Sequence, residues 1–229
     1  MSELAPAHHH ASGRTLTADE QRHLASHFDD LQQQRESATL GMWTFLATEV
    51  LFFGGLFLAL SIYRWIYPTE FLAGSDHLKW YLGTINTAVL LTSSLTVALA
   101  VHYAQAGDRR MLVRCLIWTF VLGFAFLCIK AVEYAQEYNE GLIPVLNWHY
   151  DGPGDGRKVQ LFMVLYFIMT GLHATHMVLG LAMFAWLARR AHRGDFSQAY
   201  FTPVENIGLY WHFVDVVWIF LFPLLYLIR

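Results

Sequence analysis

A transmembrane-length apolar segment near the C-terminus carries three ionisable side chains, those of Glu205, His212 and Asp215. An ionisable group near the middle of a spanning helix costs a few kcal/mol on insertion scales, so such residues are retained for a purpose. His212 and Asp215 are three positions apart and share one side of a helix, while Glu205 lies about two turns earlier on roughly the same face. This stripe is therefore predicted to face protein, bound lipid headgroups or water.

Two other apolar segments also carry ionisable residues: Glu49 lies in LATEVLFFGGLFLAL, and His173 and His176 lie in TGLHATHMVLG. At 1.5 Å per residue, Glu49 lies about 12 Å from one membrane surface, and His176 lies about 18 Å from the same surface. By the same arithmetic His212 and Asp215 lie roughly 9 and 14 Å deep. These depths overlap, which predicts a buried polar layer that also includes His173 and Glu205.

The chemistry of this layer has several possible readings. Glu49 is either a protonated group that hydrogen-bonds within the bundle or a residue that gives protons access to it. His212 and Asp215 are expected to pair and to reinforce the bundle by hydrogen bonding. His173 and His176 come with no further metal ligands in a recognisable pattern, so no metal site is predicted. A haem held by two histidines would need a facing pair at equal depth.

The composition indicates a membrane protein with several spans. Of 229 residues, 55% are hydrophobic and 14% are charged, whereas soluble domains carry roughly 25% charged residues. The net charge of −3 gives no indication of a nucleic-acid partner. The expected fold is all-α, a bundle of five transmembrane helices. The predicted spans are Gly41–Trp65, Tyr81–Tyr103, Leu112–Val132, Val159–Ala188 and Ile207–Ile228.

Residues 1–39 form a polar leader without the apolar core of a signal peptide, and residues 40–229 form the membrane domain. A short surface helix is expected over Thr15–Glu36, and an ordered extramembrane loop over Glu133–Lys158. Basic residues near the span ends place the N-terminus in the cytoplasm and the C-terminus outside. Nine of them lie on the inner side: Arg14, Arg22, Arg35, Arg109, Arg110, Arg114, Arg189, Arg190 and Arg193. Five lie on the outer side: Arg64, Lys79, Arg157, Lys158 and Arg229.

Two further sets of charges are candidate sites. Lys130 and Glu133 are separated by three positions at the outer end of the third span and are expected to pair, with the lysine reaching outward toward water. Arg189, Arg190 and Arg193 are candidates for binding anionic lipid headgroups, although ordinary positive-inside charge explains them too.

Four stretches in order resemble subunit III of the haem–copper terminal oxidases. They are LATEVLFFGGLF with Glu49, IKAVEYAQEY with Glu133, TGLHATHMVLG with its two histidines, and VENIGLYWHFVDVVWIFLF, in which Glu205 precedes His212 by seven positions. The resemblance covers residues 40–229. Full-length relatives have seven helices, and this chain lacks the first two, as do five-helix bacterial forms.

The resemblance implies a non-catalytic integral subunit of a proton-pumping oxidase in the bacterial plasma membrane, which supports proton uptake, stabilises the complex and binds phospholipid. It implies no cofactor in this chain, with haem and copper held by partner subunits I and II, and a small subunit IV as a further partner. Two alternatives remain open: an accessory subunit of a nitric oxide reductase, and a stand-alone membrane cytochrome that uses the intramembrane histidines.

Overall fold

The computed structural model describes residues 24, 28, 30–144, 146–152, 154–198 and 200–227. Within these residues the chain forms helices and no strand. The helices are α2 (Leu31–Ile66), α3 (Pro68–Asp76), α4 (Trp80–Ala106), α5 (Arg109–Asn139), α6 (Gly156–Arg193) and α7 (Thr202–Tyr226). All of them except α3 are long and apolar enough to cross a membrane. The predicted all-α fold with five spans is confirmed.

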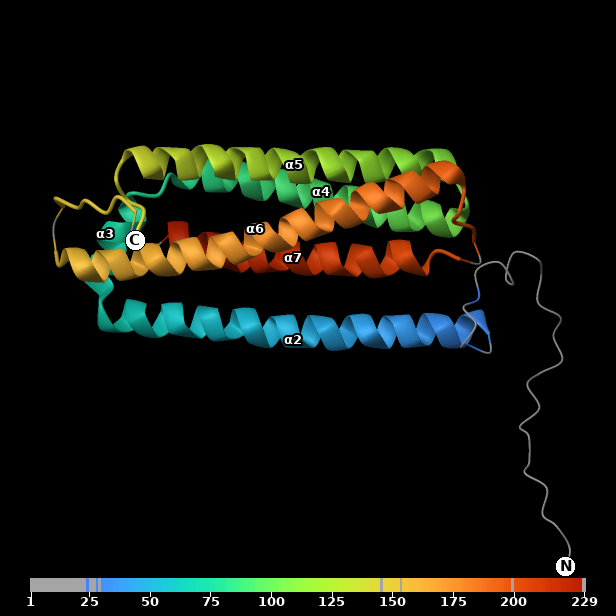
Figure 1. Ribbon diagram of the computed structural model, residues 1–229, viewed down its shortest axis with the longest axis horizontal. Coiled ribbons are helices and arrows are strands. Elements are labelled where there is room, and N and C mark those ends of the chain that lie inside the picture. The colour runs from blue at the N-terminus through green and yellow to red at the C-terminus, as the bar shows by residue number, and fades with distance from the viewer. Residues whose placement is uncertain are drawn as a thin grey trace, which may run out of the picture.

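Four of the long helices form a packed bundle, and the fifth lies beside it (Figure 1). α4 packs against α5 and α7, and α6 runs obliquely across the bundle in contact with α5 and α7. α2 contacts mainly α7 and touches α6 and α3 much less. Few residues of other helices therefore cover the two flanks of α2, and grooves lie along these flanks.

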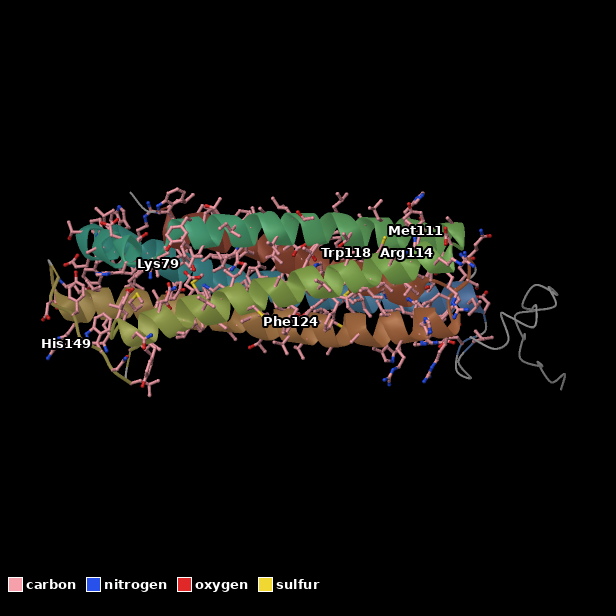
Figure 2. All side chains as sticks on the ribbon, turned by 90° about the horizontal axis from the view of Figure 1, so that it is seen from above. Lys79, Met111, Arg114, Trp118, Phe124 and His149 are labelled. Atoms are coloured by element: carbon pink, nitrogen blue, oxygen red, sulfur yellow. The ribbon has the colours of Figure 1, made fainter. Side chains whose placement is uncertain are left out.

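The bundle has two ends that differ in their connections. At the end called here the α3 end lie α3 and the 140–155 connection, and at the N-terminal end lie the start of α2 and the links α4–α5 and α6–α7. Figure 2 shows Lys79 and His149 toward the α3 end and Arg114 toward the N-terminal end.

Short polar residues and glycines set the helix ends. Asp30, Asp108 and Asp155 are N-caps whose side chains accept backbone N–H groups of the first turn. Gly107 and Gly194 follow α4 and α6 with φ of 76° and 86°, a left-handed conformation that glycine adopts without a steric penalty. α4 and α6 therefore end where the chain must turn back across the membrane.

The helices are longer than the sequence pattern indicated. α2 begins at Leu31 rather than at Gly41, because Asp30 caps it and a single glycine does not break a helix. Residues 31–36 of the predicted surface helix therefore belong to α2, which also crosses the predicted domain boundary at residue 40. Apart from residues 24 and 28, the rest of that helix and of the leader lies outside the described residues, as do Arg14, Arg22 and Arg229.

Two features at the α3 end were missed by the sequence reasoning. The sequence pattern predicted no helix over residues 68–76, although Pro68 at the first position of α3 and Glu70 in its first turn are N-terminal helix signals. α5 continues to Asn139, so the connection spans residues 140–155 instead of Glu133–Lys158. The extension forms because Glu133 and Glu137 turn into the bundle, where each is less than 5% exposed.

Candidate functional site

The strongest candidate site is a carboxyl–imidazole pair between α2 and α6. Glu49 Oε2 lies 3.2 Å from His176 Nε2. The other ring nitrogen, Nδ1, lies 2.9 Å from the backbone oxygen of Leu172, and because a carbonyl oxygen only accepts, Nδ1 carries a hydrogen. Nε2 therefore either donates to an ionised Glu49 or accepts from a protonated one. In both arrangements one proton lies between the two side chains.

Aromatic side chains hold this pair in place. The ring of Phe53 meets the His176 ring edge-on at 5.3 Å, and Tyr210 stacks on its other side at 6.4 Å. The Tyr210 hydroxyl donates to the backbone oxygen of His176 at 2.9 Å. The side chains of Glu49 and His176 are 18% and 14% exposed, so the pair is desolvated on most sides but reaches a surface.

That surface is a groove of about 790 Å³ between α2, α6 and α7. It is lined by Met42, Phe45, Glu49, His176, Leu179, Ala182, Met183, Trp186, Ile207 and Tyr210. A smaller groove of about 240 Å³ lies between α2 and α7, with an entirely apolar lining that includes Phe57 and Phe220. Only the larger groove combines an apolar wall with groups that can hold a proton.

The structure does not gather the predicted polar layer into one cluster. His173 is 1% exposed and lies against the rings of Phe126 and Trp218 at 5.6 and 5.2 Å, away from the Glu49 pair. Its ring nitrogens have no hydrogen-bond partner among the described residues. Of His173 and His176, only His176 reaches α2, because residues three apart on a helix point in directions that differ by about 60°.

His212 and Asp215 do not bond to each other. His212 Nδ1 lies 2.7 Å from Ser94 Oγ on α4. Asp215 is 3% exposed, and its carboxyl oxygens have no hydrogen-bond partner among the described residues. The expected pairing fails because a hydroxyl on the facing helix is within reach of the imidazole, whereas Asp215 lies about one turn further along α7.

Glu205 lies outside any mid-membrane layer. It sits in the first turn of α7 and forms an ion pair with Arg35 of α2, with 3.0 Å between Arg35 Nη2 and Glu205 Oε2. The Arg35 guanidinium also lies 4.8 Å from the centre of the Phe201 ring. Sequence reasoning missed Arg35 as a partner and counted it only as an inner-side charge. The ion pair between Arg35 and Glu205 joins the start of α2 to the start of α7.

The basic residues at the end of α6 are partly engaged within the chain. Arg190 Nε lies 3.0 Å from Asp195 Oδ2, and the guanidinium lies 4.9 Å from the ring of Trp186. Arg189 and Arg193 are exposed on the same helix end. Lipid-headgroup binding by these three arginines stays a prediction.

Lys130 and Glu133 lie in contact but not where the sequence placed the lysine. Lys130 Nζ is 2.8 Å from Glu133 Oε2, and the side chains are only 5% and 2% exposed. The lysine does not reach outward to water because Tyr166 and Tyr226 supply two further acceptors inside the bundle, at 3.0 and 2.7 Å. The two tyrosines were not singled out from sequence, since nothing along the chain connects them to α5.

The His212–Ser94 contact allows a direct test of its structural role. A double-mutant cycle with His212→Ala and Ser94→Ala should give a coupling energy of about 0.6 kcal/mol, typical of hydrogen bonds between membrane helices. Thermal unfolding of the purified protein measures the stability of the wild type, the two single variants and the double variant. Thr92→Ala is the control for Ser94→Ala because the Thr92 hydroxyl bonds only the backbone of its own helix. Zero coupling would show that the contact contributes nothing.

With this geometry established, comparison with known proteins gives the family. The family described as cytochrome c oxidase subunit III matches residues 18–140 and 158–228, most of the chain. The chain belongs to the cytochrome c oxidase subunit III family. The predicted resemblance is therefore confirmed, and the chain is a multi-pass membrane protein and a non-catalytic subunit of a multisubunit haem–copper oxidase.

Individual members of the subunit III family are similar over most of their length. Cytochrome c oxidase subunit 3 of Thermostichus vulcanus is 30% identical over 205 residues, 87% of this chain and 92% of the relative. A probable quinol oxidase subunit 3 of Staphylococcus epidermidis is 30% identical over 208 residues, 90% and 96% of the two chains. Cytochrome c oxidase subunit 3 of Gadus morhua is 32% identical over 196 residues, 81% and 67%.

Among the described residues, no group of three or more His, Cys, Asp or Glu side chains is arranged to hold a metal ion.

Proposed function

We propose that this subunit III supports proton uptake by its oxidase through the Glu49–His176 pair. The supporting observation is the 3.2 Å distance between Glu49 Oε2 on α2 and His176 Nε2 on α6, at the wall of a groove. A carboxyl and an imidazole in contact exchange a proton with little rearrangement, and the open side of the groove lets water or a headgroup reach them. The pair acts as a relay in the inner half of the membrane domain and carries no redox chemistry.

Membership of the subunit III family supports the assembly proposed here. The subunit joins subunits I and II, which hold the haems and copper, together with a small subunit IV where the complex has one. It lies in the bacterial plasma membrane with its N-terminus in the cytoplasm, an orientation supported by the nine-to-five distribution of basic residues. This orientation places the N-terminal end of the groove on the side from which protons are taken up.

The same groove also supports lipid binding. Its apolar wall, with Phe45, Met183 and Trp186, suits an acyl chain, and Arg189, Arg190 and Arg193 at the end of α6 suit an anionic headgroup. A bound phospholipid would cover one flank of α2, which has few protein neighbours. Lipid would then stabilise α2 against the bundle.

Replacing Glu49 with alanine tests the relay. Glu49→Ala should lower the protons pumped per electron, or the number of turnovers before inactivation, by roughly twofold or more, because the shared proton loses its carboxyl partner. The amount of assembled complex should change little, since Glu49 lies at a groove and not in the core. Proton pumping and turnover lifetime are measured on the purified complex in vesicles.

Further variants test whether the effect depends on the Glu49–His176 pair. His176→Ala should reproduce the Glu49→Ala phenotype, and the double variant should be no worse than either single one, as expected of residues acting as a unit. Glu36→Ala is the matched control, because this exposed glutamate on α2 bonds only Gln32 of its own helix. Loss of assembly with unchanged pumping per assembled complex would show that Glu49 is structural and that the relay does not exist.

A further inference from the structure

A second set of ionisable side chains, unrelated to the groove, is buried near the α3 end of α5. Lys130, Glu133 and Glu137 follow one another at intervals of three and four residues and share one face of the helix. Their exposed fractions are 4%, 1% and 4%. One cation and two carboxyl groups are therefore enclosed together between α5, α6 and α7.

The hydrogen bonds of Lys130 are fully accounted for. Its ammonium group has three donors, and these meet Glu133 Oε2 at 2.8 Å, Tyr166 Oη at 3.0 Å and Tyr226 Oη at 2.7 Å. Four aromatic rings, those of Tyr134, Tyr166, Trp218 and Tyr226, lie within 5.5 Å of the same nitrogen. Lys130 has no donor left for another carboxylate.

Both carboxyl oxygens of Glu133 also have hydrogen-bond partners. Its Oε2 accepts from Lys130, and its Oε1 accepts from the Tyr226 hydroxyl at 2.7 Å. Lys130 and Glu133 thus form a neutral pair with every charged atom hydrogen-bonded. Glu137 remains outside this arrangement, and neither of its carboxyl oxygens has a hydrogen-bond partner among the described residues.

The other charges facing Glu137 do not neutralise it. Glu140, the residue after α5, carries a like charge and is paired with Lys79, the residue before α4, at 3.2 Å. Lys79 also bonds Gln136 at 2.7 Å. Among the described residues of α6 and α7, the groups that hydrogen-bond within the cluster are the phenols of Tyr166 and Tyr226, which contact Lys130. An ionised Glu137 would be a second buried carboxylate beside a single cation that is already paired with Glu133, and proteins avoid such an uncompensated charge by keeping the group neutral.

We propose that Glu137 is a proton-binding site: its carboxyl group holds a proton in the folded subunit and exchanges it with the aqueous phase at the α3 end. The route for exchange is short, because Glu137 lies two residues before the last residue of α5, and Glu140 next to it is exposed. The site lies at the opposite end of the membrane domain from the start of α2. It therefore responds to protons on the side opposite to the proposed uptake relay, and it stands independently of that relay.

Infrared difference spectroscopy on the purified oxidase complex tests this site. The wild-type protein should show a carboxylic C=O stretching band that moves to lower frequency on transfer from H2O to D2O. Glu137→Gln should lose this band while leaving the melting temperature within about 2 °C of wild type, since a neutral amide replaces a neutral acid of the same shape.

Glu140→Gln is the matched control, because Glu140 is exposed and ion-paired with Lys79. It should lose carboxylate bands only and retain the carboxylic band. Three outcomes overturn the proposal: loss of carboxylate rather than carboxylic absorption in Glu137→Gln, a carboxylic band that does not shift in D2O, or failure of Glu137→Gln to assemble while Glu140→Gln assembles. The last would mean that Glu137 is ionised and supports the fold as a charge.

Discussion

Replacing Lys130 with methionine should lower the free energy of unfolding of the subunit by about 3–5 kcal/mol, the usual cost of removing one partner from a buried ion pair. The loss is large because Glu133 would be left without its counter-ion and with one hydrogen bond, from Tyr226, in an interior closed to water. Lys130 also links three helices, since its partners Tyr166 and Tyr226 lie on α6 and α7. Thermal unfolding of the purified complex, followed through retention of this subunit, measures the effect.

Lys79→Met is the matched control for this prediction. It also removes an ammonium group paired with a glutamate of α5, but the Lys79 side chain is 30% exposed, and such pairs contribute about 0–1 kcal/mol. The double variant Lys130→Met/Glu133→Gln should recover much of the loss, because it removes both charges together. If the double variant is as unstable as Lys130→Met, the cost lies in lost packing and not in the uncompensated charge.

The second large effect is expected for Trp211→Ala, which should cost about 3–5 kcal/mol through the cavity left in the bundle. Trp211 of α7 is fully buried and packs edge-on against Phe184 at 5.0 Å. Its indole enters spaces left by two glycines: a Cβ atom on Gly180 would lie 2.6 Å from its ring, and one on Gly123 would lie 2.8 Å away.

Trp118→Ala gives the comparison for Trp211→Ala. Trp118 lies on α5, is 61% exposed on the outside of the bundle, and is labelled in Figure 2. Its removal should change stability by only about 0.5 kcal/mol, as for other surface substitutions. Trp211→Phe should fall between the two, since it keeps much of the ring volume and loses the 3.0 Å hydrogen bond from the indole to Ser93 Oγ. Equal melting temperatures for Trp211→Ala and Trp118→Ala would contradict the packing described here.

The sequence predicted the candidate site only in part. Glu49 and His176 were both selected, because charged groups in apolar segments stand out, and their depths along the helices placed them within reach of each other. Helix depth says little about rotation about the axis, however. The rotation of α6 brings His176 to Glu49 and turns His173 toward Phe126 and Trp218. The rotation of α7 brings His212 to Ser94 instead of Asp215.

By itself the sequence determined five spans, their approximate ends and the family, because these depend on the order and apolar character of residues along the chain. Only the tertiary structure decided which buried charge meets which partner. Lys130 and Tyr226 are 96 positions apart, and their contact depends on the rotation and register of α5 against α7. A lysine near a span end was therefore expected to reach water, and it lies instead at the centre of a closed network, because the folded bundle supplies every acceptor that it needs.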